Sequence, residues 1–241
     1  MAMALKIVDV STHQDGLSFK KLKASNSDLA GAICRASYGV DEDDLFQGFM
    51  KELDALGLLM GAYHYIEGDG VSAELDTFLS VIDKYIYKCI VCLDWEETYN
   101  KLWGDLDYLE SCCDYIIERT GVRPLVYASK AHFPYDLCER LNLGTWIAQY
   151  ATNGVISGFQ ETPWNESECA CSIRQYSGNG RLSGYGAALD LDKAYMDAGA
   201  WARYADPNGV LNSGGNDVEN SGDYVIAEFN GTVKIPKDSL T

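Results

Sequence analysis

Residues 88–96 read KCIVCLDWE, an almost uninterrupted apolar run that ends on two carboxylates around a tryptophan. A short apolar run of this kind is typical of a strand that is buried on both faces, as in a parallel sheet. Side chains alternate along a strand, so Asp94 and Glu96 are expected to share the inward face. Trp95 is then expected to point the other way and to pack. The stretch therefore predicts a pair of carboxylates at the end of a buried strand.

Strand-like runs alternate with helix-like segments on both sides of this stretch. LKIVDV (5–10), AGAICRASYG (30–39) and MGAYHYI (60–66) precede it, and residues 44–59 and 72–85 have helical apolar spacing. A helix-like segment over 105–121 follows, and then come the runs RPLVYAS, GTWIAQY, CSIRQYS and AALDLDKAY. About eight strands in about 200 residues predict an α/β fold, an irregular TIM-like β/α barrel whose late helices are shortened or missing.

The composition of the sequence changes after the predicted barrel. We expect a catalytic domain over residues 1–203 and a linker over 204–222, where Asn, Gly, Asp and Ser dominate. Residues 223–241 resemble a hairpin with Asn230 and Gly231 at its turn. A single hairpin is not stable alone, so it either docks on the barrel or begins an incomplete C-terminal module.

Composition excludes several classes of protein. The chain has 241 residues and a formal net charge of −17, so it repels phosphate backbones and nucleic acid is not an expected partner. No run reaches the ~18 apolar residues of a membrane span, and the N-terminus lacks the apolar core of a signal peptide. We therefore expect a chain made in the cytosol that does not insert into membranes.

The eight cysteines are predicted to be reduced and structural. Most of them lie in apolar runs, where free buried cysteines are common. Cys89 and Cys92 have C-x-x-C spacing, but three positions apart on a strand they face opposite sides. Cys169 and Cys171 lie in a polar loop, and their redox state stays open. With three histidines in the chain, a metal site has little support.

Polar and aromatic residues follow nearly every predicted strand. In a parallel barrel these strand ends gather around one site. Aromatic faces stack on sugar rings, carboxylates and amides bind hydroxyl groups, and glycosidases need two carboxyl groups across the scissile bond. One of two close carboxyl groups stays protonated, as a general acid must. The candidate site residues are Asp9, Arg35, Tyr63, Tyr65, Asp94, Glu96, Tyr127, Trp146, Gln149, Tyr150, Gln175 and Asp190.

A set of ordered motifs carries a family resemblance. The motifs are DVSTHQ (9–14), RASYG (35–39), GAYHY (61–65), LDWEE (93–97), PLVYAS (124–129), WIAQY (146–150) and IRQYSGNGRLSGYGAALDLDKAY (173–195). In this order the chain resembles the family 25 glycoside hydrolases, the Chalaropsis-type lysozymes or N-acetylmuramidases, over roughly residues 5 to 200. Each motif alone is weak, but the ordered set is specific.

The resemblance implies an enzyme that hydrolyses the β-1,4 bond between N-acetylmuramic acid and N-acetylglucosamine in bacterial peptidoglycan, without metal or cofactor. It implies that Glu96 is the proton donor and that Asp9, Asp94 and Asp190 are the other carboxylates. Asp94 is a candidate either for the nucleophile or for the group that orients the substrate's N-acetyl group. The remaining candidate residues would line sugar subsites. The family motif often has asparagine at the position of Asp192, so this chain carries an extra carboxylate.

Alternatives stay open for function and for single residues. A chitinase-like hydrolase would favour a longer series of acids before Asp94, which this chain lacks. A non-catalytic wall-binding module would not need Glu96. Asp190 could be structural, paired with Arg35 or Arg174, and His64 is expected to form hydrogen bonds in the pocket wall.

The expected biological role is that of a phage endolysin, which reaches the wall from the host cytoplasm through a holin. A bacterial autolysin or a secreted lysozyme of the same activity is the alternative. The C-terminal segment is expected to bind wall polymers if it belongs to a module.

Overall fold

The computed structural model describes residues 4–164, 166–209, 224–228 and 232–236. The chain divides into two compact units, Met1–Val210 and Leu211–Thr241. Within the described residues, no helix has both the length and the apolar character needed to cross a bilayer.

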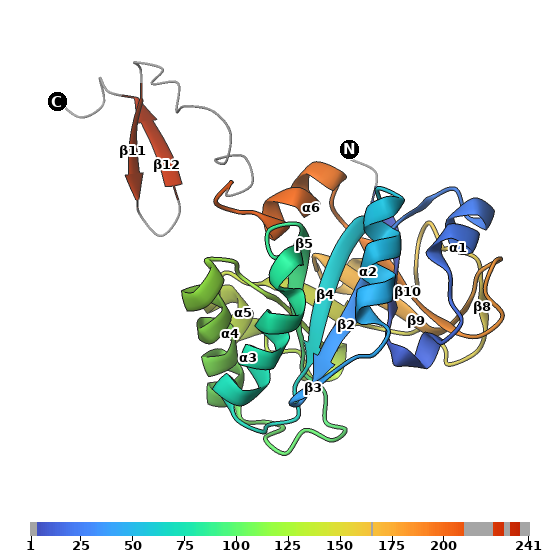
Figure 1. Ribbon diagram of the computed structural model, residues 1–241, viewed down its shortest axis with the longest axis horizontal. Helices are drawn as coiled ribbons and strands as arrows, with labels where there is room; N and C mark the ends of the chain where they lie inside the picture. Colours follow the sequence, from blue (N-terminus) through green and yellow to red (C-terminus); the bar gives the residue numbers. More distant parts are fainter. Residues whose placement is uncertain (1–3, 165, 210–223, 229–231, 237–241) are drawn as a thin grey trace. The chain divides into compact units, whose positions relative to one another are not determined.

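The first unit is built on a closed barrel of eight strands (Figure 1). The strands are β1 (Leu5–Val10), β2 (Leu29–Tyr38), β4 (Leu59–Tyr65), β5 (Cys89–Asp94), β6 (Leu125–Ser129), β7 (Gly144–Ala148), β9 (Ile173–Arg181) and β10 (Leu189–Ala194). The pairing of β1 with β2 closes the ring. Two short strands, β3 (Asp41–Glu42) and β8 (Ile156–Ser157), extend β2 and β9. The predicted α/β barrel with eight strands is confirmed.

One strand of the barrel runs against the others. The barrel strands β1, β2, β4, β5, β6, β7 and β9 run parallel to one another, but β10 is antiparallel to both β9 and β1. Asp190 was expected at the end of a parallel strand, and this expectation is wrong. Asp190 is the second residue of β10, and the reversed direction brings it to the rim where the other strands end.

Helices cover the outside of the early strands and become sparse later in the chain (Figure 1). They are α1 (Phe19–Ser25), α2 (Phe46–Ala55), α3 (Val71–Ile82), α4 (Leu106–Thr120), α5 (Tyr135–Leu141) and α6 (Ala198–Ala205). Short 3₁₀ turns occupy Thr12–Gln14, Asp83–Tyr85, Lys130–His132 and Glu166–Glu168. No α-helix lies between β7 and β9 in the described residues, and β9 continues to β10 without one. The prediction of shortened or missing late helices is confirmed.

Local sequence explains where these helices lie. Helix α2 buries Phe46, Phe49, Met50 and Leu53, which share one face at helical spacing. Helix α4 begins where the Asp105 side chain accepts from the Tyr108 N–H. It ends at Gly121, whose φ of 71° is a left-handed conformation that glycine adopts without strain.

Two layers of apolar side chains fill the molecule. An inner cluster inside the barrel contains Ile7, Ile33, Ile90, Leu125 and Ile173. An outer cluster lies between the strands and the helices. Every residue of β5 is buried, as expected for a strand covered on both faces.

All eight cysteines are free, and six of them are buried. Cys92 belongs to the inner cluster and Cys89 to the outer one, so the predicted opposite orientation is confirmed. Burial raises the pKa of Cys89 to about 12, which keeps this thiol protonated.

The second unit contains a strand pair. Strands β11 (Tyr224–Glu228) and β12 (Thr232–Pro236) pair in antiparallel fashion. The expected turn residues Asn230 and Gly231 lie outside the described residues, as does most of the expected linker. Helix α6 extends to Ala205, two residues into the range assigned to that linker.

Candidate active site

The structure brings the four predicted carboxylates to one end of the barrel. Asp9 and Asp190 are direct partners in the register of β1 and β10. Asp94 is the last residue of β5, and Asp9 and Asp94 are 5% and 6% exposed. The carboxyl charge of Glu96 acts on Asp9, Asp94 and Asp190. These groups come from three strands and the segment that follows β5.

Glu96 lies two residues beyond the end of β5, and its orientation depends on one backbone bond. The Trp95 N–H donates to the Tyr127 carbonyl over 2.8 Å, which extends the pairing with β6 by one residue. Trp95 is 1% exposed and packs on Trp103 with ring centroids 5.5 Å apart. The predicted packing role of Trp95 is confirmed, and Glu96 remains free to face the site.

Burial raises the pKa of Glu96 above its ordinary value, although a hydrogen bond with Tyr127 opposes the change. Burial also raises the pKa of Asp94 well above its usual range, and the charges of Glu96 and Asp9 add to this effect. The Arg35 guanidinium acts in the opposite direction. Burial and mutual repulsion therefore favour the protonated forms of these carboxyl groups, as a general acid requires.

Gln175 joins three of the predicted residues below the rim. Its Nε2 donates to Asp9 Oδ2 over 2.7 Å. Its Oε1 accepts from the Tyr127 hydroxyl over 2.7 Å and also from the Tyr150 hydroxyl. Gln175 is 3% exposed and Tyr150 is 38% exposed, so Tyr150 is the member of this group that offers a ring to the surface.

Arg35 lies beside the carboxylates, but its ion-pair partner is not Asp190. Its Nε lies 2.9 Å from Asp43 Oδ2, and its guanidinium lies 4.8 Å from the centre of the Tyr38 ring. Arg174 likewise has other partners, among them Gln149 Oε1. The alternative in which either arginine pairs with Asp190 is therefore wrong.

Trp146 forms the floor of the site rather than an open sugar platform. It is 1% exposed, and its ring edges contact Tyr63 and Tyr127. Its Nε1 donates to Asp192 Oδ1 over 2.8 Å. Tyr63 is 8% exposed and belongs to the inner cluster as well. Stacking of a sugar directly on Trp146, as expected from sequence, does not fit this burial.

Gln149 does not face the site, contrary to expectation. Its Oε1 accepts from Arg174 and its Nε2 donates to Glu168 over 2.9 Å. The reason is alternation: Trp146 points into the barrel, and a residue three positions further points out. Gln149 therefore anchors the segment that leads into β9.

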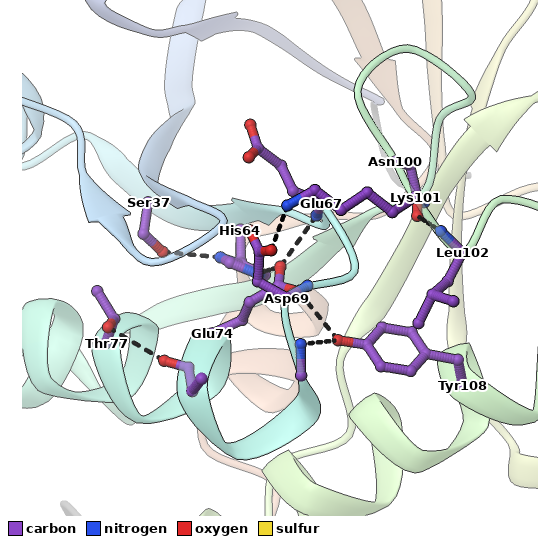
Figure 2. A network of polar contacts seen from close by, with 12 residues as sticks. Ser37, His64, Glu67, Asp69, Glu74, Thr77, Asn100, Lys101, Leu102 and Tyr108 are labelled. Atoms are coloured by element: carbon purple, nitrogen blue, oxygen red, sulfur yellow. Dashed lines mark hydrogen bonds and ion pairs between the residues drawn. The ribbon is translucent and has the colours of Figure 1, made fainter.

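His64 does not lie in the pocket wall, contrary to expectation. It is fully buried, and it lies between Ser37 Oγ, 2.8 Å from Nδ1, and Glu74 Oε2, 3.0 Å from Nε2 (Figure 2). Its neighbours Tyr63 and Tyr65 take the inward positions on β4, so His64 must point outward to α3.

Glu74 is the centre of this outer network (Figure 2). It accepts from the Glu67 N–H over 2.9 Å, from the Asp69 N–H and from the Tyr108 hydroxyl. Burial would raise the pKa of Glu74, but the bonds from His64 and the backbone outweigh it and lower the pKa to about 2. The network fixes the segment that follows β4.

An open pocket of about 460 Å³ adjoins Glu96. Its lining residues are His13, Arg35, Tyr38, Tyr65, Glu67, Glu96, Thr98 and Tyr99. Sequence reasoning missed Glu67, Thr98 and Tyr99, which lie beyond the strand-end residues that it considered. The aromatic type of Tyr99, three residues beyond Glu96, was the sequence signal that could have identified it, and the structure leaves this side chain 79% exposed.

Comparison with known proteins agrees with this geometry. The model of the family described as glycosyl hydrolases family 25 matches residues 8–185. An autolytic lysozyme of Clostridium acetobutylicum is 25% identical over 195 residues, which cover 78% of this chain and 55% of the relative. The chain thus spans about half the length of that curated relative.

Solved structures share the fold. The catalytic domain of an endolysin from bacteriophage P40 of Listeria monocytogenes has a TM-score of 0.67 at 20% identity, covering 85% of this chain and 99% of that one. A family 25 glycosyl hydrolase from Bacillus anthracis has a TM-score of 0.65 at 19% identity, covering 83% and 93%. Because the family match spans most of the barrel and includes Asp9, Asp94 and Glu96, this chain belongs to glycosyl hydrolases family 25.

Proposed function

We propose that the barrel is a lysozyme, an N-acetylmuramidase that cleaves the β-1,4 bond between N-acetylmuramic acid and N-acetylglucosamine in peptidoglycan. This proposal rests on the pairing of Glu96 with the buried Asp94 beside an open pocket. Burial raises the pKa of Glu96. A protonated carboxyl group next to a second carboxyl group is what glycoside cleavage requires.

Glu96 donates its proton to the glycosidic oxygen as the bond from that oxygen to the anomeric carbon breaks. Asp94 Oδ1 is buried and has no hydrogen-bond partner among the described residues. It is therefore free to accept the N–H of the substrate's 2-acetamido group, whose carbonyl oxygen then attacks the anomeric carbon. Water then attacks the anomeric carbon from the side that the leaving group occupied, and the bond from this carbon to the acetamido oxygen breaks. The Glu96 carboxylate takes the proton of the water, and the configuration is retained.

The test is the identity of the new reducing ends. Purified Gram-positive peptidoglycan is digested with the protein, the products are reduced with borohydride, and the reduced ends are identified by mass spectrometry. Reduced N-acetylmuramic acid ends support the proposal. Reduced N-acetylglucosamine ends would mean a glucosaminidase, and walls that bind the protein without new ends would mean a binding module.

For the biological role we propose a phage endolysin that acts on the wall from the host cytoplasm through a holin. The fold shared with the phage P40 catalytic domain supports this role, whereas the autolytic relative favours a bacterial autolysin. The two are separated by expressing the chain in a Gram-positive host with and without a holin. Lysis that depends on the holin supports the endolysin, and lysis without it supports an exported autolysin.

We also propose that binding to the wall rests on specific contacts, with the C-terminal segment as the candidate binding element. A chain of net charge −17 gains no electrostatic attraction to anionic wall polymers. The full chain carrying Glu96→Gln should therefore sediment with purified walls at both low and high salt. Release by high salt would contradict this proposal.

A further inference from the structure

Asp192 is a carboxylate that the reaction above does not use. It is fully buried in β10, where its register partners are Ile7 on β1 and Gln175 on β9. The indole Nε1 of Trp146, inside the barrel, donates to its Oδ1 over 2.8 Å. The side chain therefore points into the barrel, beneath the site.

The other oxygen of Asp192 needs a donor. Asp192 Oδ2 is buried and accepts no hydrogen bond from an N–H group or a hydroxyl of the described residues. The Asp9 carboxyl group lies in hydrogen-bonding contact with Asp192, and Asp9 Oδ2 already accepts from Gln175. Two ionised carboxylates in contact repel each other, whereas one shared proton turns the contact into a hydrogen bond.

We propose that Asp192 is a positioning residue that shares one proton with Asp9 and holds Asp9 uncharged below the substrate site. The proposal concerns the folded protein itself, and only its effect on turnover rests on the proposed lysozyme function. Burial raises the pKa of both groups, that of Asp192 to about 8.

The surroundings of the pair favour retention of this proton. Titratable groups that interact with Asp9 or Asp192 come from strands all around the barrel or from the segments that follow them. They are Cys34, Tyr63, Cys92, Asp94, Glu96, Tyr127, Tyr150, Tyr176 and Asp190. All of them are acids. Loss of the shared proton would therefore add a second negative charge among groups that oppose it.

An uncharged Asp9 has a consequence for the catalytic carboxylates. A charge on Asp9 raises the pKa of both Asp94 and Asp190. With the proton held between Asp9 and Asp192, this charge lies deeper in the barrel, beside the Trp146 indole. Asp94 can then ionise more readily while Glu96 keeps its proton.

The first test counts protons in the folded state. Asp192→Asn keeps the side-chain shape and the acceptor for Trp146, and its amide can donate to an ionised Asp9. Urea unfolding is measured from about pH 5 to about pH 8, where the slope of the unfolding free energy against pH gives the difference in bound protons between the two states. We expect the negative slope of the wild-type protein to become shallower by one proton per molecule in the variant.

Two further variants keep the test decisive. Asp136→Asn, an exposed residue of α5, makes the same change of formal charge and should leave the slope unchanged. Asp9→Asn should remove the same single proton as Asp192→Asn, and the double variant should remove no more than either one. Equal slopes in all variants, or two protons lost in the double variant, would overturn a shared proton.

A second readout follows turnover. In Asp192→Asn, Asp9 stays charged next to the catalytic pair, so the pH profile of kcat/KM should move to higher pH. A purely structural role for Asp192 would lower activity at every pH without moving the profile. If the wild-type protein released no reducing ends, the proposed function would fail, while the unfolding measurement would still decide the shared proton.

Discussion

Gln175 Nε2 lies 2.7 Å from Asp9 Oδ2, although these residues are 166 positions apart in the sequence. This bond links β9 to β1 across the intervening β10, and the other end of the same amide accepts from Tyr127. The orientation of the Asp9 carboxyl group therefore depends on an amide contributed by a distant strand.

Replacement of this amide should disturb both stability and turnover. Gln175→Met keeps the volume but removes one hydrogen-bond partner from Asp9 and one from the Tyr127 hydroxyl. We expect a loss of about 1–3 kcal/mol in the unfolding free energy and a fall in kcat/KM, measured by urea unfolding and by release of reducing ends. Gln47→Met is the control, because Gln47 donates to the Val81 carbonyl away from the site. Wild-type kcat/KM in Gln175→Met would show that the bond is dispensable.

Glu96→Gln should keep the fold and remove turnover. The amide cannot donate a proton to the leaving oxygen, and general acid catalysis contributes about 10²–10⁴-fold to rate. Glu97→Gln is a matched control, because Glu97 is exposed and adjacent in sequence. It should retain the wild-type rate. A Glu96→Gln variant with undiminished turnover would assign the acid to another carboxyl group.

The stability of the protein should fall as the pH rises from acidic values toward neutrality and above. The pKa of Asp190 and that of Asp192 are each raised to about 8 in the folded state. The folded state therefore binds protons that the unfolded chain releases above about pH 4. Each such group lowers stability by about 1.4 kcal/mol per pH unit between its unfolded and folded pKa.

The pKa shift of Glu74 has the opposite effect on the pH dependence of stability. Its folded pKa of about 2 means that its contribution is present above the unfolded value and is lost as pH falls toward 2. The two effects together predict greatest stability at mildly acidic pH, which unfolding curves over a pH series will measure. A stability maximum above pH 8 would contradict the raised pKa values of Asp190 and Asp192, and stability that kept rising as pH fell to 2 would contradict the lowered pKa of Glu74.

The network around Glu74 should control the segment that follows β4. Glu74→Gln directs an amide N–H toward backbone donors at Glu67 and Asp69 and weakens the pair with His64. We expect a loss of about 3 kcal/mol in unfolding free energy, typical of a broken buried pair, and faster hydrogen exchange at the two backbone amides. Glu139→Gln, an exposed change on α5, should alter neither. Unchanged exchange in Glu74→Gln would mean that other contacts hold the segment.

The local features of this protein follow from its amino-acid sequence. Apolar runs of strand length alternate with helical spacing, and this pattern predicts an eight-stranded barrel because burial of apolar side chains drives both periodicities. The alternation of side chains along β5 predicted the packing of Trp95. Because strand ends meet at one rim, the same reasoning predicted where Asp9, Asp94 and Glu96 would gather.

The way in which distant strands and side chains meet depends on the folded arrangement of the whole barrel. The reversed direction of β10 brings Asp190 to the rim, and local propensity does not encode strand direction. The burial of Trp146 and the contact between Asp9 and Asp192 depend on which strands become neighbours when the barrel closes. Each of these contacts joins residues far apart in sequence, and their energies exist only after the intervening chain has folded.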